Sequence, residues 1–483
     1  MKKSAVALGV IVVLGAAWTG GAWFTGKTAE AEYGRQIELV NQEMASINSL
    51  SQQGIDVKIE NVKFERGLFS SYVSYDTVVK SLIDEQSWIF SFDGKVYHGP
   101  LPLDQVSQFN FKPVMFSTTM QMVKNDKTQT WFDATKGKNP VLSNASVGYD
   151  RRIKGDLQIA AGEFKLQGVD SSWSDVKIAY DTDKSGKGRY EYDIAKVKAL
   201  FDREGLEKYA DVQQNSNLNS MDIELSTLKG VNDMQPTTFP KILVGSHNIN
   251  LGSLKYSYTF KDGAVPPMQF EFKNSALNYS VAQKDNFLNY SFKNNVENID
   301  INGHALGQLQ FNIQLDHLVA KAMERLIGIS PSDNATLEEV GLELLQNQPH
   351  LQIAPLALTS PDGKLDLEVN IELSNADLTK VSQGKLLTLF NQLSFQMNAD
   401  KKAMENIISI LQQSEGKSKE ESDQLAQQQV AEYVQEAVRG GAVMDSEKSI
   451  SAKLILENNE LKFNGNTVPE EYIGLFLMGL MMR

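Results

Sequence analysis

The chain has 483 residues, of which 41% are hydrophobic and 22% charged. This is the composition of a folded protein long enough for more than one folding unit, and it excludes a membrane protein with many spans. The formal net charge of −13 comes from acidic residues spread along the chain, so there is no basic stripe and nucleic acid is excluded as a partner. The absence of cysteine excludes disulfides and thiolate metal sites.

The N-terminal segment predicts the compartment. Lys2 and Lys3 precede an uncharged, apolar run over 4–26. At about 1.5 Å per helical residue, this run is long enough to cross a hydrocarbon core of roughly 30 Å. Positive charge before the run predicts a cytoplasmic N-terminus. We therefore expect residues 1–28 to be a single-pass signal anchor in a bacterial inner membrane, with the body in the periplasm; a cleaved signal peptide is the alternative.

The end of the same run imitates a nucleotide-binding loop. Residues 21–28 read Gly-Ala-Trp-Phe-Thr-Gly-Lys-Thr, which matches the spacing of a phosphate-binding loop. Such a loop needs a flexible backbone between a strand and a helix, and an acidic magnesium ligand downstream. Two aromatic residues occupy the loop, and no alternation of strands and helices follows. We expect a helix here, and no cofactor.

Hydrophobic periodicity predicts the remaining elements. Helical spacing continues from 29 to about 50, and a period of two then dominates to about 315, which predicts successive antiparallel strands. Further helices are expected over 316–348, 400–439 and 469–482, and further strands over 365–373, 393–397 and 454–463.

These elements predict an α+β fold that is mainly antiparallel β, with an N-terminal transmembrane helix followed by a large curved β-sheet and several accessory helices. We divide the chain into an anchor over 1–28, a β-rich lobe with an N-terminal helix over 29–240, and a β-rich lobe with helical insertions and a C-terminal helix over 241–483. No linker rich in proline, glycine or serine marks the boundary at 240.

Three segments carry a resemblance to a known family. They are Trp-Thr-Gly-Gly-Ala-Trp-Phe-Thr-Gly-Lys at 18–27, Asn-Val-Lys-Phe-Glu-Arg-Gly-Leu-Phe-Ser-Ser at 61–71, and His-Gly-Pro-Leu-Pro-Leu at 98–103. In this order, and over nearly the whole chain, the sequence resembles the YdgA/YihF family of bacterial envelope proteins, whose function is unknown. The resemblance implies an inner-membrane anchor, a periplasmic body and a candidate homodimer. It supplies no catalytic residues.

Two places contain candidate contact residues near the start of the chain. His98 stands before a rigid Gly-Pro pair, where it is a candidate ligand or base, although a structural turn explains it as well. Arg66 and Phe69 are candidates for contact with a partner; the competing interpretation is a turn in which Gly67 adopts a left-handed angle. The histidine spacing matches no zinc motif, so no metal site is expected.

Aromatic residues at alternate strand positions suggest the main site. Tyr256, Tyr258, Phe270 and Phe272 are expected to share one face of the concave sheet. If that face is an open groove, it would bind lipid or an envelope protein, whereas a filled core would exclude lipid carriage. The leading hypothesis is therefore a non-enzymatic binding protein. The alternatives are a structural or signalling module that dimerises through its helices, and an envelope enzyme that uses His98.

Overall fold

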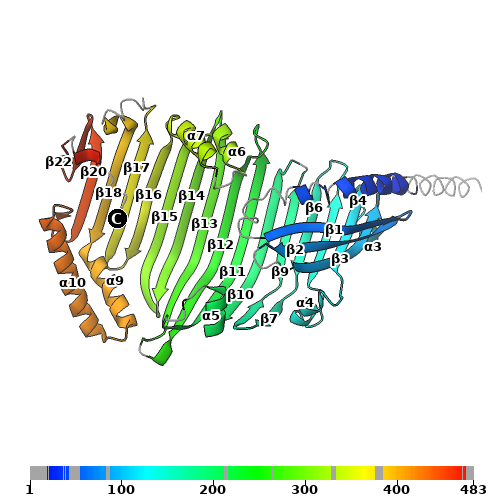
Figure 1. Ribbon diagram of the computed structural model, residues 1–483, viewed down its shortest axis with the longest axis horizontal. Helices are drawn as coiled ribbons and strands as arrows, with labels where there is room; N and C mark the ends of the chain where they lie inside the picture. The colour runs from blue at the N-terminus through cyan, green and yellow to red at the C-terminus, as the bar shows by residue number, and fades with distance from the viewer. Residues whose placement is uncertain are drawn as a thin grey trace, which may run out of the picture.

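The strands form one sheet of 22 strands (Figure 1). The computed structural model describes residues 19, 21–35, 37–38, 40–42, 55–82, 87–183, 185–210, 213, 216–263, 265–327, 333–375, 385–469 and 472–474. The strands are β1 (Ile55–Arg66), β2 (Ser70–Ser81), β3 (Ser87–His98), β4 (Phe116–Met122), β5 (Val141–Val147), β6 (Ile153–Ile159), β7 (Gly162–Leu166), β8 (Val169–Trp173), β9 (Val176–Thr182), β10 (Gly188–Phe201), β11 (Leu218–Pro236), β12 (Leu243–Phe260), β13 (Met268–Lys284), β14 (Phe287–Ile301), β15 (His304–Val319), β16 (His350–Ser360), β17 (Gly363–Leu373), β18 (Phe390–Asp400), β19 (Met444–Asp445), β20 (Ser449–Glu457), β21 (Glu460–Phe463) and β22 (Asn466–Thr467).

The sheet is an antiparallel meander. Nearly every strand pairs with the next one along the chain. The departures are that β6 pairs with β9 around the β7–β8 hairpin, that β8 pairs with β10, and that β18 pairs with β20. This confirms a fold that is mainly antiparallel β. The residue 240 boundary falls in the turn between β11 and β12, which pair along their length, so the sheet continues across it. Strongly twisted open sheets of more than about ten strands are rare unless they curl, split into two sheets or flatten.

A row of irregular positions crosses the middle of the sheet. Thr227 and Asn274 have left-handed backbone angles, with φ of 54° and 51°. The pairings on either side place Gly252 between them on the intervening strand. A residue in this conformation interrupts the alternation of side chains, so that Leu225 and Leu228, which flank the row on β11, share a face. One face therefore stays apolar on both sides of the row.

The described helices lie mainly at the ends of the strands. They are α3 (Leu103–Ser107), α4 (Gln129–Ala134), α5 (Arg203–Tyr209), α6 (Ala320–Leu326), α7 (Asn334–Leu345), α9 (Lys401–Ser414) and α10 (Lys419–Arg439), with short 3-10 turns at Lys261–Gly263 and Leu386–Leu389. In Figure 1, α6 and α7 lie at one end of the strands, and α4, α5 and α9 lie at the other. The helices expected over 400–439 are confirmed, and helices lie within the expected range 316–348, but the first of them begins at Ala320 because residues 316–319 continue strand β15.

Local chemistry explains the start and end of the longest helix. The Ser418 hydroxyl accepts a hydrogen bond from the backbone N–H of Glu421, acidic residues occupy the first turn of α10, and Arg439 lies in its last turn. The strand β16 was missed by the sequence analysis. It contains Pro355, after a cis peptide bond, and the pairing register shifts at this point.

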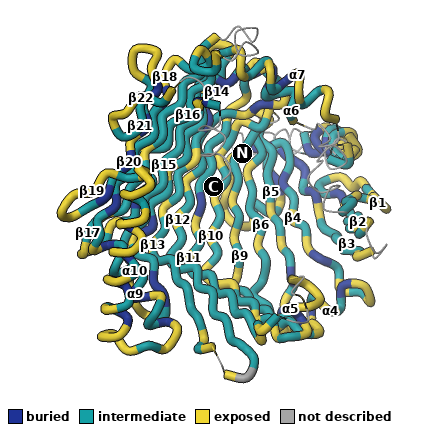
Figure 2. Tube along the Cα trace, turned by 60° about the vertical axis from the view of Figure 1, so that its left-hand side comes forward, coloured by how far each residue is buried: buried dark blue, intermediate teal, exposed yellow. Residues whose placement is uncertain are grey.

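The buried clusters lie where helices meet the sheet. Ile242, Val281, Leu288 and Ala320 form one cluster beside α6, while Ala399, Val430, Val434 and Ile450 form another beneath α9 and α10. Figure 2 shows that most of the strand surface between these clusters is only half-buried. The described part of the fold is thus a broad sheet with packed ends.

The two ends of the chain were predicted to be apolar helices. None of the described helices is long and apolar enough to cross a membrane. Most of the expected anchor, residues 1–18, lies outside the described residues, and the chain is helical over 21–35, without a break at 28. Of the helix expected over 469–482, only residues 469 and 472–474 are described, and Ile473 is buried against Leu393 and Leu454.

Candidate functional site

One face of the sheet carries an uncharged row of side chains from one end of the meander to the other. Paired positions on successive strands connect it directly, and only glycine, serine, asparagine and tyrosine interrupt its purely aliphatic, phenylalanine and methionine lining. We call it the apolar row. It consists of Phe64, Val73, Gly94, Met120, Ser143, Leu157, Ile178, Tyr192, Gly230, Ile249, Leu277, Asn294, Phe311, Leu356, Leu367, Met397 and Ala452.

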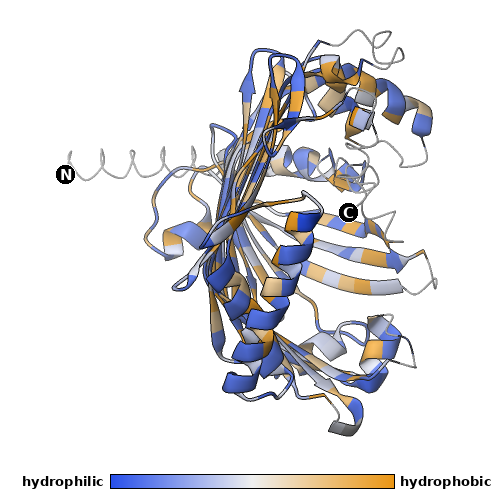
Figure 3. Cartoon of the chain, turned by 90° about the vertical axis from the view of Figure 1, so that its left-hand side faces the viewer, coloured by the Kyte–Doolittle hydropathy of each residue, from blue (hydrophilic) through white to orange (hydrophobic). Residues whose placement is uncertain are grey.

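The adjacent positions on the same strands face the other way and form a polar row. Its paired residues form two runs, separated at β16 where the pairing register shifts: Glu65, Tyr72, Lys95, Thr119, Asn144, Asp156, Ala179, Glu191, Val231, Asn248, Asn278, Lys293 and Asn312, and then Glu368, Gln396 and Lys453. This alternation is the period of two that the sequence displays, and Figure 3 shows it as alternating hydropathy along the strands. The sheet has one apolar and one polar face.

The apolar face is hollowed in two places. A hollow of about 330 Å³ near the start of the sheet is lined by Tyr75, Phe92, Met120 and Leu157 among others. A second hollow, of about 420 Å³, lies between β15 and β20 and is lined by Leu356, Leu367, Phe395, Met397 and Met404 among others. Both volumes fall within the range of roughly 300–1,000 Å³ that is typical of ligand pockets. The apolar face is therefore not filled throughout by the protein's own side chains.

The N-terminal helix packs on the apolar face at its beginning. Ala29 is buried with Val73 and Val96, and the Tyr33 ring lies 5.5 Å from that of Phe64. Met120 packs against this cluster and also lines the first hollow. Burial raises the pKa of the Tyr33 hydroxyl well above its ordinary value, so the phenol is neutral. The helix thus covers the beginning of the apolar row, and the first hollow lies directly beside it.

The His98 ring lies where this helix meets the sheet. Its ring is 1% exposed, with Nδ1 3.0 Å from the Leu68 carbonyl oxygen and Nε2 2.8 Å from Ser71 Oγ. A carbonyl only accepts, so Nδ1 carries the proton and Nε2 accepts from the Ser71 hydroxyl. Burial lowers the pKa of His98, and the nearby charge of Arg66 adds to the effect, although the hydrogen bond to Leu68 opposes it. The neutral ring is held on both sides.

The helix approaches His98 through its smallest residue. A Cβ atom added at Gly26 would lie 2.5 Å from the His98 ring, and one at Gly21 would lie 2.7 Å from the Pro100 ring. The Thr25 hydroxyl donates to the Gly99 carbonyl oxygen at 3.0 Å. The eight residues that imitate a nucleotide-binding loop are therefore helical, and several of them face a protein surface. No cradle for a phosphate exists there.

Arg66 and Phe69 also lie where the N-terminal helix meets the sheet. Arg66 forms an ion pair of 3.1 Å with Glu30 of the helix, and the Phe69 carbonyl oxygen accepts from the His98 N–H at 2.8 Å. The expected left-handed angle at Gly67 is wrong, since Gly67 does not have a positive φ. Glycine is required there because a Cβ would lie 2.5 Å from the Ser70 carbonyl oxygen. The three segments that carry the family resemblance thus contact one another; we call this the helix junction.

The four aromatic residues predicted to share a face lie far along the sheet from the helix junction. Tyr256 pairs with Phe270, and Phe272 pairs with Leu254 one step further. The Tyr258 and Phe270 rings lie 6.3 Å apart, and Phe270 packs against Ile410 of α9. The structure therefore places them together on the apolar face, partly beneath α9. Sequence reasoning did not identify Ile410 as their cover, because helical spacing does not reveal which strands a helix contacts.

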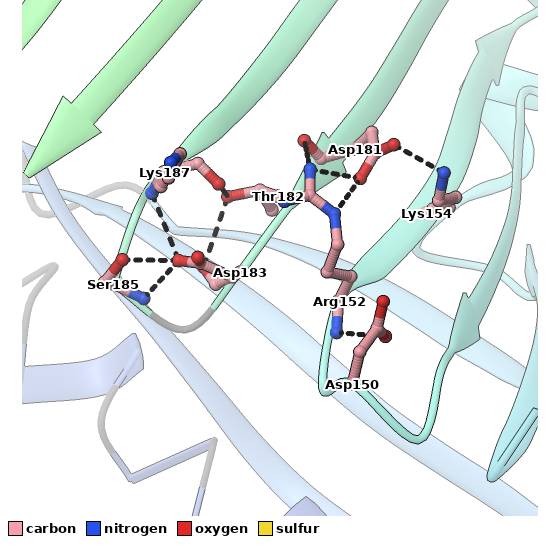
Figure 4. Close-up of polar contacts among 8 residues, drawn as sticks. All are labelled: Asp150, Arg152, Lys154, Asp181, Thr182, Asp183, Ser185 and Lys187. Atoms are coloured by element: carbon pink, nitrogen blue, oxygen red, sulfur yellow. Dashed lines mark hydrogen bonds and ion pairs between the residues drawn. The ribbon is translucent and has the colours of Figure 1, made fainter.

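The polar face is tied together by ion pairs between strands. Arg152 donates to Asp181 Oδ1 at 2.8 Å, and Lys154 Nζ lies 2.6 Å from Asp181 Oδ2 (Figure 4). These hydrogen bonds, that of Lys154 first, lower the pKa of Asp181. Lys229 pairs with Asp193 at 3.1 Å in the same manner. These groups are partly exposed to solvent, and such pairs contribute little stability each.

Among the described residues, no group of three or more His, Asp or Glu side chains is arranged to hold a metal ion. The site available to a ligand is thus a long uncharged surface, which offers hydrophobic and dispersion contacts and excludes groups that need charge neutralisation. Its geometry defines a class of β-sheet protein with one extended apolar face and a helix docked at its beginning.

The chain belongs to the family described as bacterial proteins of unknown function (DUF945), whose model matches residues 1–471. An uncharacterized protein of Haemophilus influenzae is 31% identical over 333 residues, covering 68% of this chain and 86% of the relative. Protein YdgA of Escherichia coli K12 is 25% identical, covering 99% of this chain and 97% of the relative. The uncharacterized protein YihF of the same bacterium is 20% identical, covering 98% of each chain. No solved structure matches.

Proposed function

We propose that this protein is a lipid-binding protein of the bacterial envelope, which takes up acyl chains along its apolar row and catalyses no reaction. The observation that carries the proposal is the unbroken uncharged row beside a polar one. At roughly 4.8 Å per strand, such a row covers a path on the order of 80 Å, much longer than one acyl chain. The row is long enough for many acyl chains, or for one acyl chain in many positions.

The nature of the lining favours lipid over a folded protein partner. The second hollow is lined almost wholly by leucine, phenylalanine, methionine and alanine, which offer no hydrogen bonds to a peptide backbone. An acyl chain needs none, whereas a buried peptide group without a partner costs free energy. The apolar run over 4–26 supports attachment to the inner membrane, with the body in the periplasm. The helix junction would then hold the first hollow close to that membrane.

The test uses photo-crosslinking on two adjacent residues that face opposite ways. A benzophenone amino acid replaces Leu367, which lines the second hollow, or Glu368 on the polar row. The full chain is expressed in the bacterial envelope and irradiated, and the adducts are analysed by mass spectrometry. We expect lipid adducts at position 367 and none at 368. Equal labelling at both positions, or no lipid at 367, would overturn the proposal.

Native mass spectrometry of the same protein in mild detergent gives an independent reading. Stoichiometric co-purified lipid is the expected result. A lipid-free dimer would instead favour the alternative of a structural module that acts as a homodimer.

A further inference from the structure

We propose that the loop after α3 inserts into the surface of a lipid bilayer, as a second membrane contact beside the N-terminal helix. This loop is part of the connection that leaves β3 after the Gly99–Pro100 pair, contains α3 and returns to β4. Two backbone hydrogen bonds join the two ends of this connection, from Gly99 N–H to the Met115 carbonyl oxygen at 2.7 Å and from Val114 N–H to the Pro100 carbonyl oxygen at 3.0 Å. Nothing proposed above requires this loop to be apolar.

Two phenylalanines project from the loop into solvent. Phe109 is 85% exposed and Phe111 is 60% exposed, and neither belongs to a buried cluster of the described residues. Leu103, at the start of α3, is exposed as well. Burial therefore does not explain these side chains. Apolar groups that gather on a surface without a folding role are typical of an interaction site.

The backbone at Phe109 is also unfavourable for the residue it carries. Its φ is +59°, directly after the helix, where Phe109 N–H donates to the Val106 carbonyl oxygen at 3.0 Å and Asn110 N–H donates to that of Gln105 at 2.9 Å. Glycine or asparagine usually occupies this position, because a bulky side chain is strained there. A strained, exposed phenylalanine in place of glycine points to a function outside folding.

The loop is attached to the helix that the sequence predicts to lead into a membrane. Gly21 lies against Pro100 at the base of the loop, and the Thr25 hydroxyl bonds to Gly99. On the helix, Trp23 and Phe24 are exposed. Aromatic side chains at the end of a membrane-spanning helix are typical of the boundary between lipid headgroups and hydrocarbon. A bilayer is therefore the occupant that fits both the exposed helix face and the loop. This inference rests on the membrane attachment in the proposed function.

The absence of cysteine allows a direct test. Phe109→Cys is labelled with an environment-sensitive fluorophore in the full chain, which is reconstituted in phosphatidylethanolamine and phosphatidylglycerol vesicles. Tyr433→Cys, an exposed aromatic position on α10, is the matched control. We expect a blue shift of emission at 109, together with quenching by nitroxide lipids. Quenching should be strongest for labels near the headgroup, because interfacial residues lie about 5–10 Å deep. The control should show neither effect.

Each outcome decides between the two proposals. A label at 109 that behaves like the one at 433 overturns bilayer insertion, as does a blue shift without nitroxide quenching, which would indicate a protein contact. Crosslinking at Leu367 tests lipid on the apolar row without involving the loop. Insertion at 109 without lipid at 367 would therefore refute only the lipid-binding function, and lipid at 367 without insertion at 109 would refute only this inference.

Discussion

At the scale of single residues, His98 shows how a histidine serves packing when both ring nitrogens are hydrogen-bonded. The ring is neutral, buried, and in contact with a glycine of the N-terminal helix. A base or ligand needs access to its reacting partner. The Leu68 carbonyl and the Ser71 hydroxyl occupy the two nitrogens that would do this work.

Protonation of His98 should weaken the folded state. Burial lowers its folded pKa below the ordinary value of 6.5, so the unfolded chain binds a proton more readily. The free energy of unfolding should therefore be unaffected by His98 above that value and decline as the pH falls through it. The variant His98→Gln, which keeps a donor and an acceptor but cannot titrate, should lack this component. Urea unfolding of both proteins at about pH 8 and pH 5.5 measures the difference; equal pH dependence would contradict the prediction.

At the scale of elements, the helix junction depends on how closely a helix approaches a sheet. The N-terminal helix approaches β3 only because Gly26 has no side chain where His98 lies, and the ion pair between Arg66 and Glu30 crosses the same contact. The junction combines residues from three distant segments of the chain. It therefore behaves as one packed unit, in which a small change in volume is felt.

A methyl group at Gly26 should disrupt the junction. Gly26→Ala places a Cβ 2.5 Å from a ring that its hydrogen bonds prevent from moving aside. Overpacking of this kind costs roughly 1–3 kcal/mol. The control is Gly34→Ala on the same helix, where no described atom outside the local helix backbone lies within 4 Å of the new Cβ and alanine should stabilise the helix by up to about 1 kcal/mol. Relative to the unmodified protein, the midpoint of thermal unfolding should fall in Gly26→Ala and rise in Gly34→Ala. A shift in the same direction for both variants would refute the close contact.

At the scale of the whole molecule, the meander converts a short sequence period into a long surface. Each strand contributes alternating apolar and polar positions, and antiparallel pairing in register aligns them across the sheet. The irregular row through Thr227, Gly252 and Asn274 keeps the same face apolar where the alternation is interrupted. Helices pack over the ends of this face and leave its centre half-buried.

A charge in the middle of the face should divide the lipid path. Phe292 pairs with Tyr279 and Ile313 and lies between the two hollows, whereas Lys293 next to it faces the polar side. In Phe292→Glu, we expect lipid crosslinks at Leu157 to persist and those at Leu367 to be lost, because a carboxylate in an apolar path is unfavourable. Lys293→Glu should leave both unchanged. Retained crosslinks at Leu367 in Phe292→Glu would argue against movement along the row.

The sequence alone determined the class of the fold, because the period of two and the turn residues are local properties that antiparallel strands express directly. It also determined that Tyr256, Tyr258, Phe270 and Phe272 are alternate positions on strands, so their shared face followed from the register of one hairpin. A strand containing a proline, β16, was lost because its local signal is broken.

Only the tertiary structure decided which residues from distant parts of the chain contact one another. The contact of Gly26 with His98, the cover that Ile410 provides for Phe270, and the continuous apolar row all join residues far apart in sequence. The exposure of Phe109 belongs here too, since an apolar residue in a loop reads the same whether it is buried or not. Local patterns specify conformation, whereas proximity arises only when the whole chain has packed.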